Sequence, residues 1–390
     1  MTGAAASAVD RVPAAAAASG AWRTGDEPGR RQFADVGRLE LERGGALGAV
    51  RVAYETWGRL SPARDNAVLV EHALTGDSHV TGPAGPGHPT PGWWDGLIGP
   101  GRALDTGRWF VVATNVLGGC QGTTGPASPG PDGSPYGSRF PFVTVRDQVA
   151  AEVAVADRLG IDAWALVLGG SMGGMRAIEW AVTHLDRVER LLVVASCAAA
   201  TGDQIAWCAA QLAAIRSDPG FRGGDYHDAP AGSGPHLGLG VARRVAHATY
   251  RSDTELDLRF GRRPQRGEEP LGGSGRYAVE SYLDHHAAKL VERFDAGTYV
   301  VLTEAMNSHD VGRGRGGLAA ALGQVRAQTL VAAIDSDRLY PVRLSHELAD
   351  AIPGCPPVRL LHSPYGHDGF LIETDAVGEL VAELLGDAAT

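Results

Sequence analysis

A serine stands in a glycine-rich turn, residues 169–173, between a strand-like run and a helix-like segment. Residues 165–168 are all apolar, as in a buried strand, and apolar residues recur at helical spacing after the turn. Glycines two positions before and after Ser171 permit a tight turn that a Cβ would obstruct. The turn would place the serine hydroxyl at a helix N-terminus, where the helix dipole favours developing negative charge. The pattern G-x-S-x-G in this context predicts a nucleophilic serine at a strand-to-helix elbow.

Strand-like and helix-like segments alternate along most of the chain. Short apolar runs end in Gly, Ser, Asp or His, and segments with apolar residues every three or four positions lie between them. Runs that are apolar on both faces suit the central strands of a parallel sheet. The alternation predicts an α/β chain with a mostly parallel, doubly wound sheet. The predicted strands are residues 67–74, 109–116, 165–168, 191–195, 329–334 and 358–362.

The alternation stops between residues 203 and 325, where helix-like segments dominate. Residues 207–215, 239–250 and 277–294 have helical spacing, and residues 297–302 fit either a strand or a helix. Such an insertion between two strands would form a helical cap over the carboxyl ends of the sheet, where open α/β sheets bind their ligands. A separate helical domain with no part in catalysis is the alternative. The predicted division is a flexible N-terminal extension (1–31), a core (32–202 and 326–390) and a helical cap (203–325).

A serine hydroxyl needs a base to take its proton, and the base needs an orienting acid. The last two predicted strands are each followed by a loop that carries such a residue. Asp337 is the predicted acid, with Asp335 as its rival, and His367 is the predicted base, with His362 as its rival. The order Ser, Asp, His is the order of the α/β-hydrolase fold, which is therefore the predicted fold.

The tetrahedral intermediate of such a reaction also needs two backbone N–H donors. One is expected from Met172, the residue that follows the nucleophile. The other is expected from the loop after an early strand, where the amide of Leu74 is the candidate.

Composition narrows the kind of partner and the compartment. A net charge of -10 argues against nucleic acid as a partner, because phosphate binding needs clustered cations. The four cysteines lie too far apart for a CxxC motif, and the histidines lack the spacing of a metal site, so no metal is predicted. No run approaches the roughly 18 apolar residues of a membrane span. The Ala-rich N-terminus has no basic segment ahead of an apolar run, and we expect a cytosolic protein.

Several further segments carry a resemblance to a known family. From about Tyr54 to its C-terminus, the chain resembles the homoserine O-acetyltransferases, the MetX-type acyltransferases of methionine biosynthesis. Generic α/β-hydrolases do not share the segments GWWD and GGCQGTTGP, so the resemblance is more specific than the serine motif alone. The matching segments are residues 72–80, 92–95, 115–126, 169–180, 242–243, 279–283, 336–341 and 366–371.

The resemblance implies transfer of the acetyl group of acetyl-CoA to the hydroxyl of L-homoserine by a ping-pong route through Ser171. It implies Arg243 and Asp368 as contacts of the amino-acid substrate, with Tyr250 supporting that pocket. A guanidinium suits a carboxylate and a carboxylate suits an ammonium, although Arg244 is an equally basic neighbour. The family also implies a homodimer formed through the cap, with acetyl-CoA as co-substrate and no tightly bound cofactor.

Several alternatives stay open at this stage. An esterase has the same three residues and differs only in whether water or a bound alcohol reaches the acyl-enzyme. Succinyl-CoA could replace acetyl-CoA, and serine could replace homoserine. A catalytically inactive binding module is disfavoured because Ser171, Asp337 and His367 are all present. The Arg/Gly-rich loop at residues 312–317 could contact CoA phosphates or be solvated, and Glu71 stands where the family usually has an apolar or small residue.

Overall fold

The sheet that carries the fold has eight strands, of which six lie between two neighbours and two, the first and the last in sheet order, form the edges. The computed structural model describes residues 16–386. The first strand pairs antiparallel with the second, and the second pairs antiparallel with the third in sheet order; all later pairs are parallel. This mostly parallel α/β sheet confirms the predicted fold class. The sheet order is β1 (Gln32–Glu40), β2 (Ala46–Trp57), β6 (Phe110–Thr114), β3 (Ala67–Glu71), β7 (Leu166–Gly170), β8 (Arg190–Val194), β9 (Gln328–Ile334) and β10 (Arg359–Leu361).

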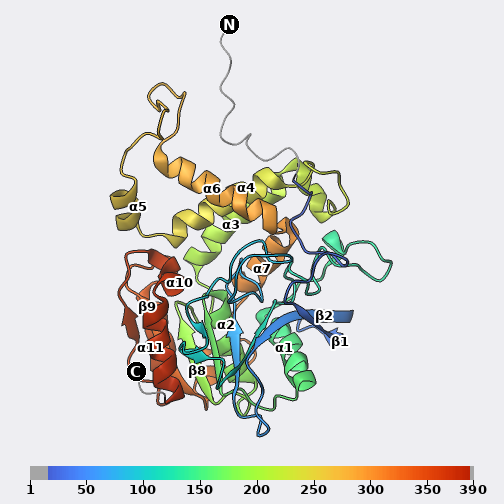
Figure 1. Cartoon of the computed structure of the whole chain (residues 1–390), viewed down its shortest axis with the longest axis vertical. Helices are drawn as coiled ribbons and strands as arrows, with labels where there is room; N and C mark the ends of the chain where they lie inside the picture. Colours follow the sequence, from blue (N-terminus) through green and yellow to red (C-terminus); the bar gives the residue numbers. More distant parts are fainter. Residues whose placement is uncertain (1–15, 387–390) are drawn as a thin grey trace.

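Helices cover both faces of the sheet, as expected for a doubly wound fold (Figure 1). On one face lie α1 (Val145–Leu159), α2 (Met172–Thr183) and α9 (Val342–Ala351), whose apolar side chains form one core cluster with the strands. On the other face lies α11 (Thr374–Leu385), which packs in a second cluster. That cluster also takes in the short two-stranded sheet of β4 (Ile98–Gly99) and β5 (Leu104–Asp105). The central strands β6, β3, β7, β8 and β9 are therefore buried on both sides, which explains their continuous apolar runs, whereas the edge strand β1 is largely exposed.

The predicted insertion lies between β8 and β9. Figure 1 shows α4 and α6 crossing above one end of the sheet, and α7 lies between them and the core. Residues 297–302, which fit a strand or a helix, are helical. The last part of the insertion, α8, packs with α2 and α9 in the core cluster, so it belongs with the sheet layers. The helices are α3 (Gly202–Ser217), α4 (His236–Tyr250), α5 (Asp253–Arg259), α6 (Ala278–Arg293), α7 (Ala296–Asn307) and α8 (Leu318–Leu322).

The N-terminal segment was predicted to be a flexible extension over residues 1–31, and this is wrong for residues 16–31. Ala18 and Ala21 are buried in the cluster that joins the cap to the core. The amide of Gly20 donates to the carbonyl of Phe294 in the cap, and the amide of Trp22 donates to the carbonyl of Cys120 in the core. Residues 16–31, which we call the strap, therefore link the cap to the core. Residues 1–15 of the predicted extension lie outside the described residues.

The strap forms a hydrogen bond with the buried carboxylate of Asp295, which precedes α7. It accepts hydrogen bonds from Ser19 Oγ (2.7 Å), from Tyr226 Oη (2.6 Å) and from the amide of Thr298 (2.7 Å), and His227 Nε2 lies 3.1 Å away. Burial alone would raise the pKa of Asp295, but its hydrogen bonds and the His227 ring lower it to about 2. The ionised form is thus the one that the fold stabilises.

No helix within residues 16–386 is long and apolar enough to cross a membrane.

We expect Asp295→Asn to lower the free energy of unfolding by about 3 kcal/mol at pH 7, because it breaks a buried charged network. The difference between wild type and variant should be complete above about pH 4 and shrink as the pH falls toward the folded pKa. Urea unfolding across this pH range measures it. Asp228→Asn is the control, since that side chain is 72% exposed and its ion-pair distance to Arg23 is 3.8 Å. Equal stability losses in both variants would contradict the role of Asp295.

Candidate active site

The turn between β7 and α2 has the strained geometry of a nucleophile elbow. Ser171 adopts φ 58° and ψ −126°, a conformation that non-glycine residues rarely hold. A Cβ on Gly173 would lie 2.1 Å from the carbonyl oxygen of Glu71, and one on Gly169 would lie 2.4 Å from the carbonyl carbon of Gly173. Ser196 Oγ, in the loop after β8, donates to the carbonyl of Ser171 (2.8 Å) and supports the turn. The glycines of the motif are thus required by close backbone approach.

Asp337 and His367, which the sequence places after neighbouring strands, meet in the structure. His367 Nδ1 lies 2.6 Å from Asp337 Oδ2, and both side chains are buried. The other oxygen, Asp337 Oδ1, accepts the backbone amides of Leu339 and Tyr340, each at 2.8 Å. These two amides fix the carboxylate, so its free oxygen holds the proton of His367 on Nδ1 and leaves Nε2 as the basic nitrogen.

Aromatic rings hold the imidazole of His367 in place. The ring of Tyr340 stacks on it, with centroids 4.8 Å apart, and Phe370 meets it edge-on at 5.4 Å. The ring of Tyr250 from the cap lies 5.8 Å away. A histidine packed in this way keeps one orientation toward its partner groups.

The rival residues Asp335 and His362 pair with each other instead. Their side chains lie 2.9 Å apart, and the side chain of His362 is 80% exposed. Because Asp335 Oδ1 also accepts the amide of Ser363, this pair serves to tie two loops together at the surface.

The two backbone donors predicted for the oxyanion hole come from adjoining segments. β3 ends at Glu71, three residues earlier than predicted, because the chain turns and the amide of Gly76 donates to the carbonyl of Ala73. Met172 is the first residue of α2, so its N–H has no carbonyl partner within the helix. Leu74 and Met172 are both buried in the cluster that joins cap and core.

A buried charge cluster that the motifs did not reveal links these two segments. Arg176 on α2 donates from Nη2 to the carbonyl of His72 (2.7 Å), and its Nη1 lies 2.8 Å from Glu71 and 2.7 Å from Glu152. All three charged side chains are buried, and burial raises the pKa of Glu71 well above its ordinary value. The unusual Glu71 therefore has a partner, Arg176, which the sequence motifs gave no reason to single out.

The residues implied as substrate contacts lie next to His367. Asp368 is nearly buried; burial raises its pKa, and the nearby charges of Arg243 and His367 counteract that rise. The guanidinium of Arg243 lies over the ring of Tyr250, 5.6 Å from its centroid, and Nη1 donates to Thr75 Oγ1 at 3.4 Å. A cation and an anion thus lie near His367.

The competing arginine, Arg244, is engaged elsewhere. Its Nη2 lies 2.8 Å from a carboxylate oxygen of Asp284 on α6, so it binds the cap helices together.

The Arg/Gly-rich loop at residues 312–317 uses its charges within the protein. Arg313 Nη2 lies 2.9 Å from Glu42, and Arg315 Nη2 lies 2.5 Å from Glu179 on α2. Each guanidinium is therefore paired with a carboxylate, which gives the loop a structural role and leaves no support for a contact with CoA phosphates.

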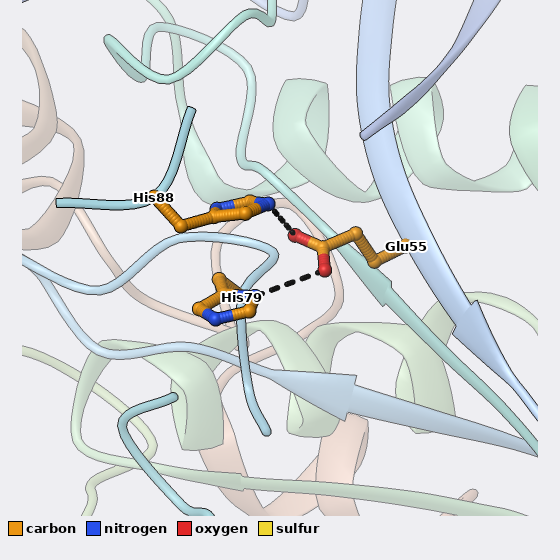
Figure 2. A group of neighbouring side chains, drawn as sticks. All are labelled: Glu55, His79 and His88. Atoms are coloured by element: carbon orange, nitrogen blue, oxygen red, sulfur yellow. Dashed lines mark hydrogen bonds and ion pairs between the residues drawn. The ribbon is translucent and has the colours of Figure 1, made fainter. Parts of the chain in front are cut away.

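One group within residues 16–386 has the donor types and spacing that could hold a metal ion: Glu55, His79 and His88 (Figure 2). His79 Nδ1 lies 3.0 Å and His88 Nε2 3.6 Å from the two carboxylate oxygens. However, the imidazoles are stacked with centroids 3.8 Å apart and 13° between their planes, whereas a bound ion lies near the plane of each ring. His88 Nε2 also accepts the amide of Arg30 at 3.0 Å. The group is arranged as a buried ion pair, and the stacked rings do not fit a shared metal.

The fold and this site define an enzyme of the α/β-hydrolase class with a serine at its elbow. The sequence model of the alpha/beta hydrolase fold family matches residues 66–374. A homoserine O-acetyltransferase from Thermobifida fusca (strain YX) is 64% identical over 369 residues, which cover 94% of this chain and 97% of that protein. The chain therefore belongs to the homoserine O-acetyltransferase family, and the resemblance inferred from the motifs is confirmed.

Solved structures agree on the fold but include two kinds of enzyme. The homoserine O-acetyltransferase from Bacillus anthracis matches with a TM-score of 0.83 and 28% identity, over 92% of this chain and 98% of that one. Esterase E22 matches with a TM-score of 0.82 and 26% identity, over 91% and 99% of the two chains. The architecture is therefore shared by transferases and esterases.

We expect Gly173→Ala to lose at least about 1–3 kcal/mol of stability, because its Cβ would overlap the carbonyl of Glu71 and force the elbow to shift. Activity per folded molecule should fall as well, since Ser171 and Met172 move with the turn. Thermal unfolding and an acyl-transfer assay measure the two effects. Gly202→Ala at the start of α3 is the control, since its Cβ would meet nothing within 4 Å. A Gly173→Ala protein with wild-type stability and activity would contradict this account of the turn.

Proposed function

We propose that the protein transfers the acetyl group of acetyl-CoA to the hydroxyl of L-homoserine, giving O-acetyl-L-homoserine and CoA, a step of methionine biosynthesis. The observation that carries this proposal is the 64% identity, over 97% of its length, to a relative named for that activity. Asp337 and His367 form a pair, and Phe370, which packs on His367, also lies against Gly170 of the Ser171 elbow. Together these residues supply the chemistry that the transfer needs.

The first half-reaction acetylates the enzyme. In our proposal, His367 Nε2 takes the proton of Ser171 Oγ, and Oγ attacks the thioester carbonyl of acetyl-CoA. The carbonyl oxygen becomes an oxyanion, which the amides of Leu74 and Met172 stabilise. The intermediate then collapses: the carbon–sulfur bond breaks, and CoA leaves as a thiol with the proton from His367. Asp337 stabilises the imidazolium while it holds that proton.

The second half-reaction regenerates Ser171. L-homoserine occupies the space vacated by CoA, with its carboxylate on Arg243 and its ammonium on Asp368, and the ring of Tyr250 supports the guanidinium of Arg243. His367 removes the proton of the homoserine hydroxyl, whose oxygen attacks the acetyl-enzyme carbonyl. The bond from carbon to Ser171 Oγ then breaks, and the serine recovers its proton from His367.

An esterase is the second candidate, favoured by the match to esterase E22. The two activities differ in whether a bound alcohol or water attacks the acetyl-enzyme. Two features favour the transferase. Arg243 and Asp368 give the site opposite charges that suit an amino acid, and the cap cluster buries Leu74 and Met172 beneath apolar side chains. Water is therefore at a disadvantage against a positioned alcohol.

We further propose that the protein works as a cytosolic homodimer joined through the cap. Large apolar side chains are exposed on two cap helices that pack together, and such side chains are typical of an interface core. The four cysteines are free, which fits a reducing compartment. The exposed side chains are Ile205 and Trp207 on α3 and Leu237 and Val241 on α4.

The function is tested by release of free thiol from acetyl-CoA or succinyl-CoA, each in the presence of L-homoserine or L-serine. We expect rapid turnover only with acetyl-CoA and L-homoserine. Ser171→Ala should lower kcat by about 10⁴-fold or more, because no acyl-enzyme forms. Thiol release that proceeds equally fast without any amino acid would indicate an esterase. Turnover with succinyl-CoA or L-serine instead would reassign the donor or the acceptor.

The dimer is tested with Trp207→Glu, which would bury a charge in the proposed interface. We expect the wild type to have the mass of a dimer and the variant to shift toward monomer, as measured by light scattering coupled to size-exclusion chromatography. Leu360→Glu is the control: its side chain has the same 44% exposure as that of Trp207 but lies on β10, away from the cap. A monomeric wild type, or dissociation of both variants alike, would contradict an interface at the cap.

A further inference from the structure

Arg251, just after α4, reaches from the cap to the loop that carries His367. Its Nη1 donates to Asp368 Oδ2 at 3.3 Å. Its Nη2 lies 3.0 Å from Glu255 Oε1, and its Nε donates to Glu255 Oε2 at 3.2 Å. The guanidinium lies over the ring of Tyr365, 5.0 Å from the centroid. A side chain that is almost fully buried and uses all three of its nitrogens has one well-defined position.

The backbone around Arg251 is seated against the same loop. Ser252 Oγ donates to the carbonyl of Pro364 and accepts the amide of Glu255 (3.0 Å), so it caps α5 and joins the two segments. A Cβ on Gly366 would lie 2.6 Å from both the carbonyl oxygen of Tyr250 and the amide of Ser252. The segment that carries Arg251 is therefore in direct contact with the loop that carries Asp368, and the relative position of the two is fixed.

The charge of Asp368 depends on the cations around it. Burial raises the pKa of this carboxyl, and Arg243, His367 and Arg251 each lower it without fully offsetting the burial. Removal of one cation would therefore move the carboxyl further toward its neutral form. The titratable and charged groups that face Asp368 come from α4, α6 and the two loops: Arg243, Tyr250, Arg251, Tyr282 and His367.

We infer that Arg251 is a positioning residue for the acceptor amino acid: it orients the carboxylate of Asp368 and keeps it ionised to receive the ammonium group. This inference rests on the proposed function. Arg251 holds Oδ2 of Asp368 and so directs Oδ1 toward the substrate. Glu255 neutralises the guanidinium, so Arg251 does not repel the incoming ammonium. The bound amino acid then has one partner for each of its charges: Arg243 pairs with its carboxylate, and Asp368 pairs with its ammonium group.

Measuring the two half-reactions separately distinguishes a role in binding the acceptor amino acid from a role in supporting the His367 loop as a whole. Arg251→Met removes the charge at similar length, and Arg259→Met is the matched control, since Arg259 also pairs with Glu255 (3.3 Å) but is 48% exposed. Acetyl-enzyme formation is measured as the burst of CoA released from acetyl-CoA without acceptor. Acceptor use is measured as kcat/KM for L-homoserine across pH.

We expect Arg251→Met to keep the burst and to lower kcat/KM for L-homoserine by about 10- to 100-fold, as for a lost hydrogen bond to a charged group. In the pH profile of kcat/KM for this variant, the fall on the acid side should move to higher pH, because Asp368 then protonates more easily. With 4-hydroxybutanoate, which lacks the ammonium, wild type and variant should react equally. Arg251→Lys, which keeps the charge, should restore part of the activity and most of the pH profile. Arg259→Met should match wild type throughout.

Three results would overturn the inference: an unchanged kcat/KM for L-homoserine in Arg251→Met, an equal loss with 4-hydroxybutanoate, or a burst that falls in the same proportion. The last two would mean that Arg251 supports the His367 loop as a whole. A wild-type protein that gives the burst but does not acetylate L-homoserine would instead refute the proposed function and, with it, the ammonium partner of Asp368.

Discussion

The contact between the end of β3 and the start of α2 is the constraint on which the site depends. Gly173 allows the two backbones to touch, and Arg176 then bonds α2 to the carbonyl of His72. The segment after β3 leads to Leu74, and the start of α2 carries Ser171 and Met172. Burying a guanidinium between two carboxyls costs desolvation energy, so the cluster contributes little net stability. What it does provide is a fixed distance between the two segments that supply the proposed oxyanion donors.

A second set of contacts joins the cap to this core. The strap at residues 16–31 bonds to Asp295 on one side of the cap, and the chain after α4 rests on the His367 loop on the other. Between them, apolar side chains of the cap pack on Leu74 and Met172. The cap is therefore held at both ends and in the middle. Arg243 and Arg251, which it carries, keep fixed positions relative to Asp368 as a consequence.

The sequence predicted those parts of the site that depend on local pattern. Ser171 was recognisable from its glycines and flanking elements, and Asp337 and His367 from the strands that precede them. The strap was missed because its contact from Ser19 to Asp295 spans 276 residues and an Ala-rich segment carries no sign of its partner. Arg176 and Arg251 were missed for the same reason: each looks like an ordinary helix or surface arginine until the tertiary structure supplies its carboxylates.

The same reasoning explains how one architecture serves both transferases and esterases. In the proposed mechanism, the elbow, the Asp337–His367 pair and the two amides would act on any acyl group, and the elbow and the amides depend on the junction of β3 and α2. In the proposed mechanism, the choice between water and an amino acid depends instead on two charges near His367: Arg243 from α4 of the cap and Asp368 from the loop after β10. Arg243 and Asp368 would bind a zwitterion well only while both are ionised, and the burial of Asp368 works against its charge. The proposed specificity for an amino acid therefore calls for a further cation beside Asp368, and Arg251, whose Nη1 donates to Asp368 Oδ2 at 3.3 Å, lies at that position.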